Sequence, residues 1–188
     1  MHLPVNPSCI FFLPANKYYM GNKLTFFLVV ICIGFYGAVA YINKPHPFDK
    51  HIKWLVENSE FEYNGETYPS IDYYSSQELQ VIAYGREKIE KADSQALPKI
   101  KALYDHRNNT LMFTKGMDIK DNKTAYIVVH ELVHFLQNTN GITEKTECIQ
   151  SLEESAYKLQ AEWQRQHDHP GPYPNFLFVR LLSLSCSR

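Results

Sequence analysis

The residues with the clearest chemical potential are two histidines and a glutamate in the stretch His-Glu-Leu-Val-His at 130–134. On a helix, His130 and His134 lie one turn apart on the same face, so both rings can direct a nitrogen at one ion. Zinc is held by such nitrogens at about 2.0–2.1 Å. Glu131 is rotated by one residue, where it would take a proton from water activated by the ion. The motif therefore predicts a zinc site with its own base; the simpler alternative is two histidines satisfied in a polar core.

A catalytic zinc site usually has three protein ligands and one open position. The downstream candidates for the third ligand are Glu153, Glu154, His167 and His169. On the predicted helix at 148–166, Glu153 lies about 90° from the centre of the apolar stripe and Glu154 about 170° from it. We therefore expect Glu153 to be the third ligand and Glu154 to face solvent. The stripe consists of Leu152, Ala156, Leu159 and Trp163.

Capping and turn residues outline the elements that must position these side chains. Asp121 or Asn122 can begin a helix that reaches about residue 138 and ends at Gly141. A second helix covers 148–166, where a proline-rich stretch stops it. Residues 103–113 form strand-like runs around Asn-Asn, a pair that tolerates a tight hairpin turn. Together these elements predict an α+β domain.

The segments before the motif give weaker patterns. Residues 51–58 favour a short helix, and 61–74 contain an Asn-Gly turn signal between alternating aromatic and polar residues, which favours a hairpin. Residues 76–92 carry apolar residues at helical spacing, and Ser75 or Ser76 can cap that helix.

The motif and the helix that follows it resemble a known group of enzymes. The stretches HELVHFLQ and CIQSLEESAYKLQAEW are similar to the gluzincin type of zinc peptidase, in which His-Glu-x-x-His is followed by a glutamate on a later helix. More closely, they resemble a family of small exported bacterial proteins classed as a domain of unknown function. The match covers roughly Leu103 to Trp163. It implies a minimal zincin-like fold with peptidase chemistry.

The N-terminal segment predicts export or membrane anchoring. Leu24 to Ile42 is a run of 19 residues without a charge, long enough to just span a bilayer. Its end reads Ala38-Val39-Ala40, a small-x-small pattern that signal peptidase accepts. We therefore divide the chain into an export signal or membrane anchor at 1–40 and a metallohydrolase domain at 41–188. The location expected is periplasmic or extracellular, or anchored in the membrane by this segment.

Composition and cysteine content set further limits. The formal net charge is −1, with no clustered Lys and Arg, which argues against a nucleic-acid partner. Outside the leader only Cys148 and Cys186 remain, and in an oxidising compartment they form one disulfide or stay as two free thiols.

These observations favour a zinc-dependent hydrolase, an enzyme that cleaves a peptide or protein substrate. Zinc bound by His130, His134 and Glu153 would polarise the scissile carbonyl, and Glu131 would act as the base. Tyr157 shares a face with Glu153 and could donate a hydrogen bond to an oxyanion, but the favoured interpretation is a packing or ligand-supporting role. Gln137 and Gln160 could fix the ligands. Two alternatives stay open: a zinc-stabilised envelope binding module without turnover, and an interaction protein whose histidines are structural.

Overall fold

The computed structural model describes residues 45–91, 97, 99–175, 177 and 179–181, without the side chains of 149 and 150. The compact unit that contains these residues runs from His46 to Arg188. The expected export signal or anchor at 1–40 lies outside the described residues. Within the described part of the chain, no helix is long and apolar enough to cross a membrane.

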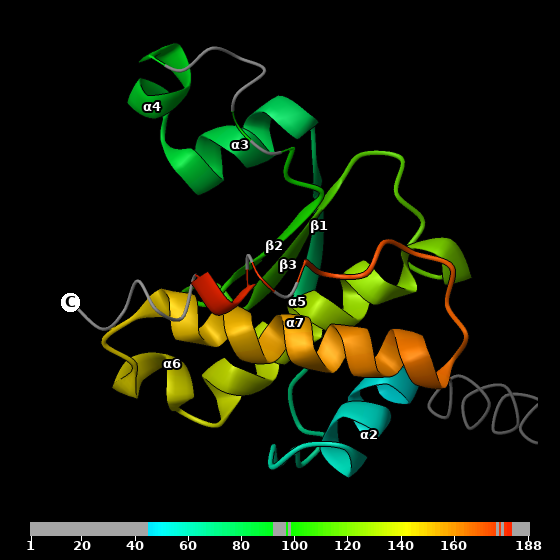
Figure 1. The fold of residues 1–188 in the computed structure, drawn as a ribbon. Coiled ribbons are helices and arrows are strands. Elements are labelled where there is room, and N and C mark those ends of the chain that lie inside the picture. Colours follow the sequence, from blue (N-terminus) through cyan, green and yellow to red (C-terminus); the bar gives the residue numbers. More distant parts are fainter. Residues whose placement is uncertain (1–44, 92–96, 98, 176, 178, 182–188) are drawn as a thin grey trace, which may run out of the picture. The chain divides into compact units, whose positions relative to one another are not determined.

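Helices surround a small sheet, so the expected α+β class is confirmed (Figure 1). The three strands are β1 (Ser70–Tyr74), β2 (Ala102–Asp105) and β3 (Thr110–Thr114). The main helices are α2 (Asp49–Glu57), α3 (Ser76–Tyr84), α5 (Ala125–Thr139) and α7 (Ile149–Gln166). Shorter helices are α4 (Arg86–Lys91), α6 (Ile142–Lys145) and the 3₁₀ turn η1 (Asn122–Thr124).

The sheet has the order β1-β3-β2, with β3 in the centre. The predicted hairpin at 103–113 is confirmed, because β2 pairs antiparallel with β3. Its turn uses Asn109 in the left-handed region with φ 48°, a conformation that asparagine tolerates. Asp105 accepts hydrogen bonds from the Arg107 backbone and the Asn108 side chain. These local bonds fix the turn. The strand order makes β2 an edge strand of the sheet among the described residues.

Helices α5 and α7 lie side by side below the sheet and form the centre of the domain (Figure 1). Both follow the predicted ranges closely, and Gly141 ends the first helical region with φ 66°. Nearly all of α5 is buried, since α2, α7 and β2 all pack against it. Cys148 precedes α7 as its N-cap and is disulfide-bonded, while Cys186 lies outside the described residues.

The hairpin expected within residues 61–74 is wrong. Only Ser70–Tyr74 is a strand, and it pairs parallel with β3 instead of with its own neighbour. The preceding backbone finds its partner in a side chain: Asn140 accepts a hydrogen bond from the Glu62 N–H and donates one to the Glu62 carbonyl, both at 3.0 Å. Asn140 thus bonds the backbone of one residue in a segment where the sequence predicted a paired strand.

The single helix expected over 76–92 is divided. Gly85 adopts φ 80° between α3 and α4, which breaks the helical path. Ser75 caps α3 with a full capping box to Glu78, as one of the two predicted caps. Leu79 is the buried residue of α3, whereas Ile82 is 48 % exposed and α4 has no buried residue. The apolar spacing in this region therefore overstated its burial.

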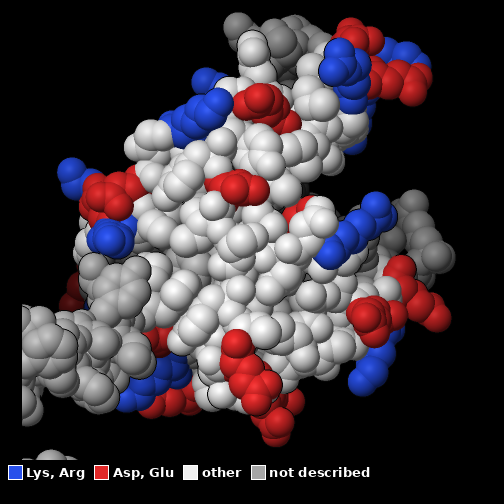
Figure 2. Space-filling model, turned by 180° about the vertical axis from the view of Figure 1, so that it is seen from behind, with Lys and Arg blue, Asp and Glu red and all other residues white. Residues whose placement is uncertain are grey.

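Charged side chains lie mainly around the margin of the face in Figure 2. Acidic and basic groups are mixed there, and the centre of this face is largely uncharged. Several pairs are local to one helix, such as Lys91 with Glu87 and Lys53 with Glu57. Exposed pairs of this kind contribute little to stability. The buried interior around α5 and α7 is where polar groups carry more weight.

Candidate metal centre

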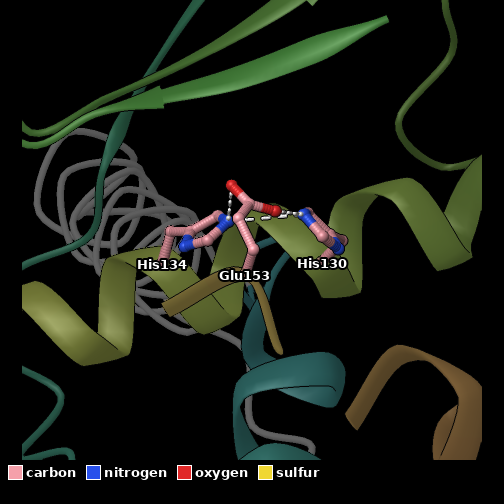
Figure 3. A group of neighbouring side chains, drawn as sticks. All are labelled: His130, His134 and Glu153. Carbon is pink, nitrogen blue, oxygen red and sulfur yellow. Dashed lines mark hydrogen bonds and ion pairs between the residues drawn. The ribbon is translucent and has the colours of Figure 1, made fainter. Parts of the chain in front are cut away.

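Three side chains from two helices meet in the middle of the domain. His130 and His134 come from successive turns of α5, and Glu153 comes from the first turns of α7 (Figure 3). The Nε2 atom of His130 lies 3.3 Å from one carboxylate oxygen of Glu153, and the Nε2 atom of His134 lies 3.4 Å from the other. The ligand atoms all lie within 4.8 Å of one another. The two helices thus bring together the three residues that the sequence indicated as ligands.

The orientation of the His134 ring is set by Gln137. The Gln137 amide nitrogen donates to the Leu152 carbonyl at 2.9 Å and to Ser155 at 2.6 Å. Since a backbone carbonyl only accepts, the Gln137 oxygen must face His134 Nδ1, at 2.8 Å. Nδ1 therefore carries the ring proton, and the other nitrogen, Nε2, faces the cluster. His130 has an analogous partner in Gln160, whose amide oxygen lies 3.1 Å from His130 Nδ1.

This arrangement fits a divalent cation. The two Nε2 atoms face each other at 3.3 Å, and both also face a carboxylate. Two nitrogen lone pairs this close repel unless a proton or a cation lies with them. Two imidazole nitrogens and one carboxylate are a donor set that zinc accepts in catalytic sites.

The electrostatics of the cluster favour a bound positive charge. Burial opposes the charge of Glu153, but hydrogen bonds from His130 and His134 hold the pKa of Glu153 far below its usual range. Burial also opposes the charged form of His134, but the hydrogen bond and charge of Glu153 outweigh it and raise the pKa of His134 to about 9. Without a metal ion, His134 therefore holds an extra proton beside Glu153, and a cation between the three side chains can replace that positive charge.

Glu131 lies next to this cluster and does not belong to it. Only 7 % of Glu131 is exposed, and burial raises its pKa above the ordinary value, which the charges of His130 and His134 partly oppose. Its carboxylate also receives a hydrogen bond from the Tyr104 backbone in β2. A carboxyl in this position, beside the cluster and in the wall of an open cleft, is placed to exchange a proton with water.

A cleft of about 510 Å³ opens above the cluster. Its floor is α5, and its sides are β2 with the residues before it, α7, and the loop that follows α7. His130, Glu131, His134 and Glu153 all line it. The residues of its walls include Lys99, Lys101, Tyr104, Tyr126, Tyr157, Pro172, Tyr173 and Pro174.

The alternative third ligands lie elsewhere. Glu154 forms an ion pair with Lys158 at 2.7 Å. We expected Glu154 to face solvent, but only 28 % of its side chain is exposed. His167 contacts the Trp163 carbonyl at 2.8 Å. His169 is buried, with its ring between the Asn122 carbonyl and the Gly171 N–H. Their places in the fold separate all three from the cluster.

The three residues expected to support the site all lie at the cluster or in the cleft. Tyr157 lines the cleft, with its ring centroid 4.5 Å from that of His130. Gln137 and Gln160 contact the two histidines as expected. The sequence interpretation missed Gln164, which is fully buried and bonded to Gln160, and the cleft wall at 172–174. A signal for Gln164 was present, because it follows Gln160 by four residues on one helix.

Comparison with known proteins assigns the chain to a family for which no activity is described. No curated protein and no solved structure matches the chain. One family model matches residues 44–187, which include the cluster, the cleft and every described helix and strand. The chain therefore belongs to the family described as "Domain of unknown function (DUF6647)".

Proposed function

We propose that this chain is a zinc-dependent hydrolase that cleaves peptide bonds in a peptide or protein substrate. The observation that carries the proposal is the convergence of His130, His134 and Glu153 beside the buried carboxylate of Glu131, on the floor of an open cleft. A purely structural zinc site is usually closed by four protein ligands. Here three ligands face a cleft, which leaves room for water and substrate.

The chemistry divides between the ion and the chain. Zinc supplies a Lewis acid that lowers the pKa of water to about 7 and polarises a carbonyl group. His130, His134 and Glu153 would hold it. Glu131 takes a proton from the attacking water and passes it to the leaving amine. Glu131 lines the cleft beside the three ligands, so its carboxylate is within reach of both the water and the leaving group.

Tyr157 is suited to assist at the carbonyl oxygen. Burial raises the pKa of its hydroxyl, and the charges of Glu153 and Glu131 add to this effect. The hydroxyl therefore stays protonated at neutral pH and can donate a hydrogen bond. A donor directed at an oxygen that gains negative charge stabilises the transition state.

The edge strand β2 gives the cleft a feature that favours extended peptides. β2 pairs with β3 on one side, and residues 99–104, which include most of β2, line the cleft. An extended peptide can add to a free strand edge through main-chain hydrogen bonds, and that mode suits many sequences. We also propose that the domain has a zincin-like fold of the gluzincin type.

Metal content and hydrolysis together test the function. Purified protein should contain one zinc per chain, and a mixed peptide library should be cleaved. Glu131→Gln keeps the shape of the side chain and removes the base, so zinc content should stay while hydrolysis falls by about 10²–10⁴-fold. Glu154→Gln is the matched control, because its ion pair with Lys158 lies outside the cluster.

Other outcomes separate the rival functions. Protein that binds zinc but cleaves no peptide is a binding module stabilised by zinc. Protein that folds well and takes up no zinc has structural histidines, and the enzyme proposal fails. Loss of zinc from Glu131→Gln would show that Glu131 is a ligand and not the base.

Export or anchoring through residues 1–40 completes the proposed function. Cleavage after Ala40 would leave Tyr41 as the first residue, which mass spectrometry of protein from a cell-envelope fraction measures directly. An intact chain in the cytoplasmic fraction would contradict export.

A further inference from the structure

A line of buried amides runs from the candidate metal centre to the wall of the cleft. His130 Nδ1 lies 3.1 Å from the Gln160 oxygen, and the Gln160 nitrogen donates to the Gln164 oxygen at 3.2 Å. The Gln164 nitrogen then donates to the carbonyl of Pro172 at 3.3 Å. We call His130, Gln160, Gln164 and the Pro172 carbonyl the glutamine relay. Gln160 is 5 % exposed and Gln164 is completely buried.

The direction of every bond in the relay follows from its last member. The Pro172 carbonyl only accepts, so the Gln164 nitrogen must face it and the Gln164 oxygen must face Gln160. Gln160 then donates with its nitrogen, which leaves its oxygen toward His130. His130 Nδ1 must therefore donate, and Nε2 faces Glu153 at 3.3 Å. The Pro172 carbonyl thus sets the orientation of the His130 ring through three successive hydrogen bonds.

The wall that carries this carbonyl is itself anchored at several points. The His169 N–H donates to the Gln164 carbonyl at 2.9 Å, so Gln164 holds the loop through its backbone and its side chain. The His169 ring accepts from the Gly171 N–H and donates to the Asn122 carbonyl, just before α5. Gly171 lies so close to Tyr126 that a Cβ there would come within 2.8 Å of that ring.

We propose that Gln164 is a positioning residue for the metal centre: through Gln160 it ties the Pro172–Pro174 wall of the cleft to His130 and holds that ring in its ligand orientation. Gln164 touches neither an ion nor a substrate. A buried amide that loses its partner is costly, so the relay keeps its members in one arrangement. The inference rests on the proposed metal site, and it extends the support of that site to the segment after α7.

Zinc affinity in the full-length protein, measured by competition with a chelator, tests this role. Gln164→Met keeps the length and volume of the side chain and removes both amide groups. Loss of partners behind a ligand typically weakens metal binding by about 10–100-fold, and we expect a loss of at least tenfold. The control is Gln166→Met on the same helix, whose amide bonds Trp54 and Asn58 and not the relay. It should leave affinity unchanged.

Double variants separate a relay from general damage. Because Gln164 acts through Gln160, Gln160→Met combined with Gln164→Met should lose no more affinity than Gln160→Met alone. Gln137→Met combined with Gln164→Met should show the sum of the two losses in binding free energy, because Gln137 supports the other histidine. Additive losses for the first pair, or unchanged affinity in Gln164→Met, would overturn the proposal.

A second measurement does not depend on zinc. In metal-free protein, proton NMR follows exchange of the His130 Nδ1 proton with water, which should become at least tenfold faster in Gln164→Met and stay unchanged in Gln166→Met. If the parent protein binds no zinc, the proposed function fails, and this exchange rate alone decides for or against the relay. If Gln164→Met does not fold, Gln164→Asn, one methylene too short to reach both partners, should show the same changes.

Discussion

Five of the histidines of this domain form two groups with different surroundings. His130 and His134 each bond a glutamine through Nδ1 and direct Nε2 at Glu153. The second group, His51, His167 and His169, surrounds Trp163 near the C-terminal end of α7, at centroid distances of 5.6, 4.5 and 5.3 Å. The first group is buried or nearly so, whereas in the second only His169 is buried, His51 is partly buried and His167 is exposed. Of these two groups, the first has nitrogens that converge on one point.

The difference lies in the hydrogen-bond partners. In the second group, His167 contacts the Trp163 carbonyl, and His169 joins the Asn122 carbonyl to the Gly171 N–H. Burial, with Lys50 and His167 nearby, lowers the pKa of His51 to about 4, whereas the carboxylate of Glu153 overcomes burial and raises that of His134 to about 9. The first group can therefore hold a cation because its lone pairs and a carboxylate converge, whereas the ring nitrogens His167 Nδ1, His169 Nδ1 and His169 Nε2 face separate backbone groups.

The largest effect should come from removing both histidines of the first group. Structural zinc sites in small peptides bind the ion with about 10–16 kcal/mol, a free energy that depends on all of their ligands. Loss of two of three ligands should therefore abolish measurable zinc binding. We expect the double variant His130→Ala, His134→Ala to contain no zinc by elemental analysis. The matched variant His51→Ala, His167→Ala should retain one zinc per folded chain. Zinc retained by the first variant would show that the cluster is not the site.

Two neighbouring glutamates test the same difference between a residue in the cluster and one outside it. Glu153 contacts both histidines, whereas Glu154 pairs with Lys158. If the binding energy is shared among three ligands, Glu153→Ala should weaken zinc binding by roughly three orders of magnitude. Glu154→Ala should change it less than twofold, as followed by chelator competition. The reverse pattern would assign the third ligand to Glu154.

Removal of His169 should lower stability, while the three ligands of the cluster stay in place. His169 is 2 % exposed, and His169→Ala would leave the Asn122 carbonyl and the Gly171 N–H without their partner. Unpaired buried groups cost about 1–3 kcal/mol each, so we expect a decrease of that order in the free energy of unfolding by urea. Zinc per folded chain should stay at one. A loss of zinc at full stability would give His169 a place in the metal site.

The smallest effect concerns pH and His51. The Nδ1 atom of His51 is buried without a hydrogen-bond partner among the described residues, and its pKa of about 4 lies below the value of about 6.5 in an unfolded chain. Between these values the unfolded state binds more protons, so stability is lost as pH falls from 6.5 toward 4, by at most about 1.4 kcal/mol per pH unit.

The variant His51→Phe isolates this contribution. Phe cannot be protonated, so the difference in unfolding free energy between the variant and the parent should shift in favour of the variant as pH falls through this window. Above pH 6.5 the difference should be constant. A difference that does not vary with pH would mean that His51 titrates normally in the folded protein.

Local sequence patterns determined the parts of this protein that depend on neighbouring residues. The spacing of His130 and His134, the end of α5, the turn at Asn109 and the extent of α7 all follow from residues within one or two turns. The predicted cap was wrong for α5, because Asp121 caps the 3₁₀ turn η1 and α5 begins only at Ala125. The same helical period pointed to Glu153 as the residue that meets the histidines, but it did not predict burial: the Glu153 side chain is 34 % exposed and that of Glu154 28 %.

Tertiary structure decided whatever depends on partners far apart in the chain. Asn140 bonds both backbone groups of Glu62, 78 residues away, where the sequence predicted a hairpin. The Pro172 carbonyl directs Gln164 and, through it, His130. Strand β1 pairs with β3, although α3, α4 and β2 lie between them in the chain. Each outcome depends on partners that only the folded chain brings together.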